Sequence, residues 1–158
     1  MSGWLWLLVL AGGGAAGLAI LAVVGLVIWQ RRHIRRACEQ FVAERKSLAD
    51  LFLQAAGATG SPRGLRWKAC DWNEEIAFAR ERKTGRLSAL VSVTIQFEAV
   101  EGGDMEGVEA VGQLRYATAV FSYDGNRWRT RGRTIFNLTP AEALERLKAE
   151  YAPVPAQS

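Results

Sequence analysis

The chain has 158 residues, which is the length of about one domain. Its net charge of +4 comes largely from the arginines of residues 31–36, so the composition does not indicate a general nucleic-acid-binding protein. Its two cysteines, Cys38 and Cys70, are too few for a disulfide framework and have no metal-binding spacing.

The N-terminal segment, residues 1–30, carries no charged side chain, and all 20 basic and 16 acidic residues follow Gln30. Residues 4–29 are apolar and would form a helix about 39 Å long, more than a hydrocarbon core of about 30 Å needs. Trp4 and Trp6 at one end and Trp29 at the other match the aromatic belts of membrane proteins. The run is too long for a cleaved signal peptide and lacks its basic start. The sequence therefore predicts a single-pass transmembrane signal-anchor.

The charges that flank this segment predict its orientation. Four arginines follow it directly, namely Arg31, Arg32, Arg35 and Arg36, whereas no charged side chain precedes it. Because positive flanks stay in the cytoplasm, we expect the N-terminus outside the cell membrane and the C-terminal domain in the cytoplasm.

Small residues mark one side of the predicted anchor. Gly13 and Gly17 form a GxxxG pair, and Gly25 lies two turns further on the same side. Such a face allows two helices to approach closely and would support a homodimer through the anchor. In a run this rich in glycine and alanine, the same spacing also arises by chance.

Residues 31–60 have the pattern of an amphipathic helix continuous with the anchor. Apolar residues recur every seven positions at Ile34, Phe41, Leu48 and Ala55. Others fill the same stripe: Ala37, Cys38, Val42, Leu51 and Phe52. The stripe would suit a coiled-coil seam, a helix at the membrane surface, or packing on the following domain. Acidic residues interrupt the polar face and the heptads are few, so packing on the domain is favoured.

Residues 61–152 change to a β-rich pattern with a C-terminal helix. We expect strands at 65–72, 76–82, 86–99, 113–123 and 127–136. Residues 86–99 alternate most clearly, with Leu90 as the one apolar residue on the polar side, which predicts one buried and one solvated face. Thr139, Pro140 and Glu142 form a capping box for the last helix, and residues 153–158 would be a loose tail.

The predicted fold is therefore α+β. A transmembrane helix would lead into a long amphipathic helix, packed on a roughly five-stranded antiparallel meander sheet, and a short helix would end the domain. In element order this resembles cystatin-like and NTF2-like folds, a likeness that implies little about function. Type IV pilins also join an apolar helix to an antiparallel sheet, but the basic leader and the glutamate of their anchor are missing here.

No group of residues in the sequence has a recognisable catalytic, cofactor-binding or metal-binding pattern. The one histidine, His33, stands among the arginines after the anchor. Asp104, Glu106 and Glu109 lie in a glycine-rich loop without the ligand spacing of a calcium site. The sequence thus predicts a protein that is not an enzyme and has no cofactor.

One pattern predicts a functional surface. Alternate residues of a predicted strand are arginines, namely Arg127, Arg129, Arg131 and Arg133. In a regular strand they would share one face, about 6.7 Å apart. Such a ladder suits phosphates, anionic lipid headgroups or an acidic protein. The alternative is a solvated face paired with Glu75, Glu81 or Glu98 on adjacent strands.

Three functions fit these observations. The first is a membrane-anchored, non-enzymatic binding or scaffold module whose partner is a protein or anionic lipid. The second is a small-ligand-binding protein or enzyme with a pocket between helix and sheet, lined by aromatic residues: Trp67, Trp72, Phe78, Tyr116 and Trp128. The third is an extracytoplasmic, pilin-like assembly subunit, which requires the opposite orientation.

Overall fold

The computed structural model describes residues 3–60 and 63–155, and for residues 3–19 it describes the backbone alone. Its elements in chain order are α1 (Gly3–Ala43), α2 (Arg45–Thr59), β1 (Leu65–Glu81), β2 (Leu87–Ala99), the 3-10 turn η1 (Glu109–Gly112), β3 (Arg115–Tyr123), β4 (Trp128–Phe136), α3 (Pro140–Arg146) and β5 (Tyr151–Pro153). The chain divides into two compact units, Met1–Arg36 and Ala37–Ser158.

The first unit is the N-terminal part of α1. Large apolar side chains between Ile20 and Trp29 are exposed, and the ring of Trp29 lies 5.5 Å from that of His33. In the described part of the chain, no helix combines the length and apolarity needed to cross a bilayer. The transmembrane helix predicted over residues 4–29 is thus not found there, and the side chains of residues 4–19 lie outside the described residues.

The predicted long helix is two helices. α1 ends at Ala43, and α2 begins at Arg45 after a turn at Glu44. Their stripe packs on the domain's own sheet, as favoured, and its buried members are Ala37, Phe41, Leu48 and Phe52. At the end of α2 the buried residue is Ala56, whereas the predicted Ala55 is only partly buried. The prediction was wrong for Val42 and Leu51, which are exposed. A break between two helices rotates the second stripe relative to the first, which a single heptad pattern does not describe.

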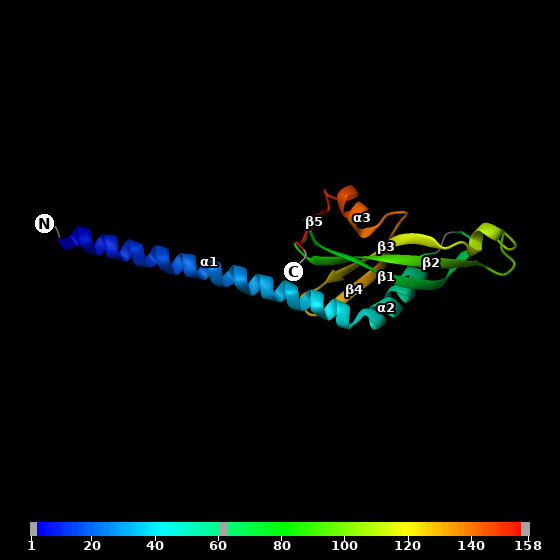
Figure 1. The fold of residues 1–158 in the computed structure, drawn as a ribbon, viewed down its shortest axis with the longest axis horizontal. Coiled ribbons are helices and arrows are strands. Elements are labelled where there is room, and N and C mark those ends of the chain that lie inside the picture. Colours follow the sequence, from blue (N-terminus) through cyan, green and yellow to red (C-terminus); the bar gives the residue numbers. More distant parts are fainter. Residues whose placement is uncertain (1–2, 61–62, 156–158) are drawn as a thin grey trace. The chain divides into compact units, whose positions relative to one another are not determined.

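The five strands form one antiparallel sheet in the order β4-β3-β2-β1-β5 (Figure 1). β1 to β4 follow one another as a meander, as the alternating pattern predicts. The two strands predicted at 65–72 and 76–82 are one strand, β1, with irregularities between Trp67 and Ala69 and between Trp72 and Ile76. Arg45 holds the second irregularity, because its Nη2 donates to the carbonyls of Trp72 and Asn73 at 3.0 and 2.8 Å.

The first face of the sheet packs against the end of α1 and against α2. Phe41 lies at the centre of this core, with ring contacts to Trp72, Phe78, Phe121 and Trp128 at 4.8–5.9 Å. The indole Nε1 of Trp128 donates to the carbonyl of Ala37 at 2.8 Å. The domain therefore includes the last turns of α1 from Ala37 onward.

The second face is covered in part by α3, which lies on the side of the sheet opposite α2 (Figure 1). A smaller core forms there from Ala79, Leu90, Val120, Ala143 and Tyr151. The prediction of a solvated second face was wrong for the first half of β2, where both faces are buried from Leu87 to Val91. Leu90, the one apolar exception in the alternation of that strand, packs beneath α3 and needs this cover.

The capping box of α3 is present as predicted. Thr139 Oγ1 accepts from the amide of Glu142 at 3.3 Å, and Glu142 Oε2 accepts from the amide of Thr139 at 2.9 Å. The tail prediction was wrong in part, because Tyr151–Pro153 forms β5, which pairs with Ala79–Glu81 of β1. Tyr151 is buried at the start of this edge strand.

Candidate functional site

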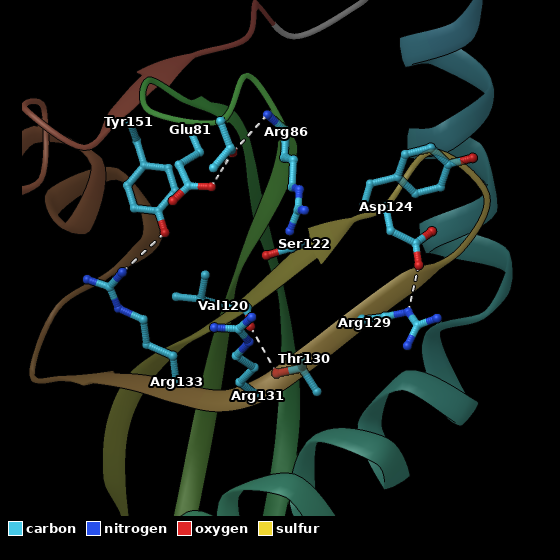
Figure 2. A pocket seen from close by; sticks show the side chains of 12 residues that line it. Glu81, Arg86, Val120, Ser122, Asp124, Arg129, Thr130, Arg131, Arg133 and Tyr151 are labelled. Carbon is cyan, nitrogen blue, oxygen red and sulfur yellow. Dashed lines mark hydrogen bonds and ion pairs between the residues drawn. The ribbon is translucent and has the colours of Figure 1, made fainter.

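A polar groove of about 500 Å³ lies on the α3 face, at the end of the sheet that holds the β1–β2 and β3–β4 turns (Figure 2). Its base is formed by Val120 and Ser122 of β3. Twelve residues line it: Glu81, Thr84, Arg86, Val120, Ser122, Tyr123, Asp124, Arg129, Thr130, Arg131, Arg133 and Tyr151. The lining includes four arginines and two acidic residues, so its formal charge is +4 − 2 = +2.

Arg129 is held at one side of the groove by the β3–β4 turn. Its Nε donates to Asp124 Oδ2 at 2.6 Å. The other oxygen of that carboxylate accepts the backbone amides of Asn126 and Arg127 at 3.1 and 3.0 Å. These hydrogen bonds, led by the Arg127 amide, lower the pKa of Asp124 to about 2, so the carboxylate stays ionised at any physiological pH.

Arg133 is held at the opposite side by the segment that follows α3. Its Nη1 donates to Glu150 Oε2 at 3.0 Å and to the hydroxyl of Tyr151 at 3.3 Å. The hydrogen bond with Glu150 raises the pKa of Arg133 further. Burial raises the pKa of Tyr151, so its phenol is neutral and remains a hydrogen-bond donor at neutral pH.

The other two arginines of the groove, Arg86 and Arg131, have no hydrogen-bond acceptor for their side chains among the described residues. Over residues 3–60 and 63–155, neither guanidinium forms a hydrogen bond or an ion pair. Figure 2 shows Arg133 turned toward Tyr151 and Arg129 toward Asp124, whereas Arg86 reaches from the β1–β2 turn toward Ser122. Two fixed and two uncommitted guanidiniums thus border the same space.

A bulge in β4 places two of these arginines in the groove. Thr130 pairs with Phe121 and Thr134 with Ala119, so the three residues 131–133 face Val120 alone. Between the two arginines, Gly132 has a φ of 73°, and a Cβ there would come within 2.6 Å of the Ala56 backbone. Arg131 and Arg133 therefore leave the sheet on the groove side, while Gly132 lies against α2.

The structure revises the arginine ladder. Arg129, Arg131 and Arg133 share one face as predicted, but the strand between them is bulged and not regular. Arg127 lies in the turn before β4, outside the groove lining, with its Nε 4.0 Å from Asp124 Oδ2.

The acidic partners predicted for the ladder differ as well. Arg129 and Arg133 pair with Asp124 and Glu150, whereas the predicted partner Glu98 pairs with Arg66 at 2.6 Å. Glu81 lines the groove but accepts a hydrogen bond from Thr84. Asp124 lies in the β3–β4 turn and Glu150 follows α3, so neither is a cross-strand neighbour of the arginines, which is the only kind of partner that strand pairing predicts.

Sequence reasoning missed Arg86 as a member of the site. Its position next to the turn at residues 83–85 could have indicated it, because alternate turns of a meander lie at the same end of the sheet. The β1–β2 and β3–β4 turns lie at the same end. An arginine beside one turn therefore lies near arginines that follow the other.

The remaining predicted site residues lie elsewhere or outside the described residues. Arg31, Arg32, Arg35 and Arg36 are exposed along α1. Of the proposed helix-dimer face, Gly25 would have nothing within 4 Å of an added Cβ, while Gly13 and Gly17, like Trp4 and Trp6, fall among residues whose side chains are not described. Nothing in the structure bears on the predicted homodimer.

The two cysteines are free and half-buried. Burial, followed by a neighbouring carboxylate, raises the pKa of Cys38 to about 11 and that of Cys70 to about 12. These thiols are therefore poor nucleophiles near neutral pH. In the described ranges, no three His, Cys, Asp or Glu side chains are grouped as metal ligands would be.

Most of the aromatic residues expected to line a pocket between helix and sheet instead pack against one another. Trp67, Trp72, Phe78 and Trp128 contact the rings of Phe41, Phe52 or Phe97. Tyr116 is 67% exposed and lies outside this core.

Comparisons of the chain with protein-family models, with curated proteins and with solved structures find no match.

Proposed function

We propose that the chain is a membrane-tethered, non-enzymatic binding module whose cytoplasmic domain binds anionic groups of its partner in the arginine groove. The observation that carries the proposal is the net positive groove, in which Arg86 and Arg131 have uncommitted donors. Guanidinium groups in a partly dry site bind carboxylates and phosphates through paired, charge-assisted hydrogen bonds. The ring contacts among the aromatic side chains between helix and sheet favour this surface over an internal pocket as the binding site.

The tether rests on the uncharged run of residues 4–29 and on the arginines that follow it. The exposed apolar side chains from Ile20 to Trp29 support it, since water is a poor solvent for such a surface. The same arginines would keep the domain in the cytoplasm and add attraction to anionic lipids at the membrane surface.

The proposed orientation predicts the behaviour of a reporter fused after Ser158. A reporter that is active only in the cytoplasm should be active, and one that requires export should be silent. Replacing Arg31, Arg32, Arg35 and Arg36 by glutamine should give mixed orientation, because these charges set the bias. An active exported reporter on the unaltered chain would reverse the proposal and favour an extracytoplasmic assembly subunit.

The groove predicts salt-sensitive binding to anionic vesicles. A fragment of residues 37–155 should co-sediment with vesicles that contain anionic lipid and much less with neutral ones. It begins at Ala37 because that carbonyl accepts the Trp128 indole, and it omits the arginines beside the anchor. Each arginine near an anionic surface contributes about 1 kcal/mol. Binding should fall steeply towards 1 M salt, where the Debye length is about 3 Å.

A matched control distinguishes binding by the groove arginines from attraction by the net charge of the domain. Arg86→Gln with Arg131→Gln should abolish most of this binding, whereas Arg66→Gln with Arg115→Gln should leave most of it. Both pairs remove the same charge, but Arg66 and Arg115 are exposed at the other end of the sheet. Equal losses in the two double variants, or equal binding to both kinds of vesicle, would remove the groove from the proposal.

A further inference from the structure

We infer that the ligand of the arginine groove is a phosphate monoester in its dianionic form. This inference rests on the proposed function and narrows it to one chemical class. The same phosphoryl group occurs on phosphorylated small molecules and on the headgroups of some lipids, and the experiment below distinguishes these two sources.

The charge of the groove supports a dianion. The residues that line it sum to +4 − 2 = +2. Glu150 pairs with Arg133 from outside the lining, and counting it still leaves a positive site. The Asp124 and Glu150 carboxylates occupy Arg129 Nε and Arg133 Nη1, which fixes these two side chains in place. A ligand with two negative charges would match the two guanidiniums that have no acidic partner in the described residues, Arg86 and Arg131.

The number of unused donors supports three terminal oxygens. Each guanidinium has five N–H donors in a planar fork, and a fork binds two oxygens at once. Arg86 and Arg131 have every donor unused in the described structure, and Arg129 and Arg133 each keep several. If the guanidiniums of Arg86 and Arg131 each bind two oxygens of one ligand and share one of them, the ligand needs three terminal oxygens. A phosphate monoester has three, whereas a phosphodiester has only two.

The size and the remaining polar groups of the groove fit a small headgroup. A space of about 500 Å³ is within the usual range for small-molecule sites, about 300–1,000 Å³. Hydroxyls of Thr84, Ser122 and Tyr151 line it together with the arginines. The Ser122 and Tyr151 hydroxyls can donate to phosphate oxygens or to the first atoms of the esterified group, whereas the Thr84 hydroxyl already donates to Glu81.

The inference predicts a preference that follows the charge of the probe. In calorimetric titrations of the full chain in a neutral detergent, methyl phosphate should bind at least tenfold more tightly than dimethyl phosphate at pH 7.5. Arg86→Gln with Arg131→Gln should weaken methyl phosphate binding by tenfold or more, and Arg66→Gln with Arg115→Gln by less than twofold. Matching circular-dichroism melts would show that both double variants keep the fold.

The pH dependence gives a second readout with a defined sign. The second pKa of a phosphate monoester is about 6, so its dianion dominates at pH 7.5 and is a minor species at pH 5. Binding should therefore weaken several-fold on acidification. Protonation of Glu81 or Glu150 would make the groove more positive and act in the opposite direction, while Asp124, with a pKa of about 2, and the arginines keep their charge.

Vesicles distinguish the two sources of the phosphoryl group. If the source is a lipid, the full chain should bind vesicles that contain phosphatidic acid, a monoester, more tightly than vesicles of equal surface charge that contain phosphatidylglycerol, a diester. If the source is a soluble molecule, methyl phosphate should bind while the two vesicle types bind equally. Either result supports the monoester.

Two results would overturn the inference, and they differ in their effect on the proposed function. Groove-dependent binding that distinguishes neither methyl from dimethyl phosphate nor phosphatidic acid from phosphatidylglycerol would reject the monoester and leave an anion-binding module. No binding that depends on Arg86 and Arg131, to any of the four probes, would reject both.

Discussion

Replacing Ile95 by aspartate should prevent the domain from folding. Ile95 is fully buried in β2, on the face that packs against the helices. A carboxyl group at this position would have no partner, and burying it, in addition to losing the apolar contacts of Ile95, costs several kcal/mol, a large part of the roughly 5–15 kcal/mol by which a domain is stable. We expect no cooperative thermal melt for this variant.

Thr94→Asp is the matched control for this substitution. Thr94 neighbours Ile95 on the opposite face, is only partly buried, and accepts a hydrogen bond from Asn73 Nδ2 at 3.3 Å. An aspartate could accept the same bond and remain in contact with water, so the melting temperature should fall by only a few degrees. If both variants melted alike, the assignment of faces in β2 would be wrong.

Replacing Gly132 by alanine should cause the second large loss of stability. A residue with a side chain at a φ of 73° costs about 1–2 kcal/mol, and its Cβ would also collide with the backbone of Ala56 at 2.6 Å. Moving α2 away from β4 to relieve this contact should cost about 1–3 kcal/mol more. We therefore expect a decrease in the free energy of unfolding of about 2–5 kcal/mol in a denaturant titration.

Gly85→Ala separates the two causes. Gly85 has a φ of 71° in the β1–β2 turn, and a Cβ added there would meet nothing within 4 Å. This variant should lose only the backbone contribution of about 1–2 kcal/mol. A loss at Gly132 no greater than that at Gly85 would show that α2 does not rest on β4 as the structure has it.

Local sequence patterns predict much of this fold, because several of its elements are determined by interactions between residues close together in the chain. The alternation of residues 86–99 and the capping box at Thr139 correspond to β2 and to the start of α3. The stripe through Phe41 and Leu48 predicts correctly that the helices pack on the sheet. Each of these signals lies within a few residues of the feature it predicts.

The features that the sequence did not predict depend on contacts between distant segments. β5 exists because Tyr151–Pro153 reaches the edge of β1, which its composition does not indicate. In the bulge of β4, Gly132 lies against Ala56, which is far away in the chain. The same holds for the groove: three of its arginines were predicted to share a face, but Arg86 joins them only through the arrangement of the two turns.

The bulge at Gly132 also bears on how the protein behaves at high concentration. β4 is an edge strand, and the open edge of a sheet can pair with the edge of another copy and start aggregation. Here the residues 131–133 interrupt the regular spacing of backbone donors and acceptors, and the arginines around them add like charges that repel a second copy. Copies of the membrane-tethered module that we propose would be confined to two dimensions and meet often, and the same arginines that border the groove would then keep neighbouring domains apart.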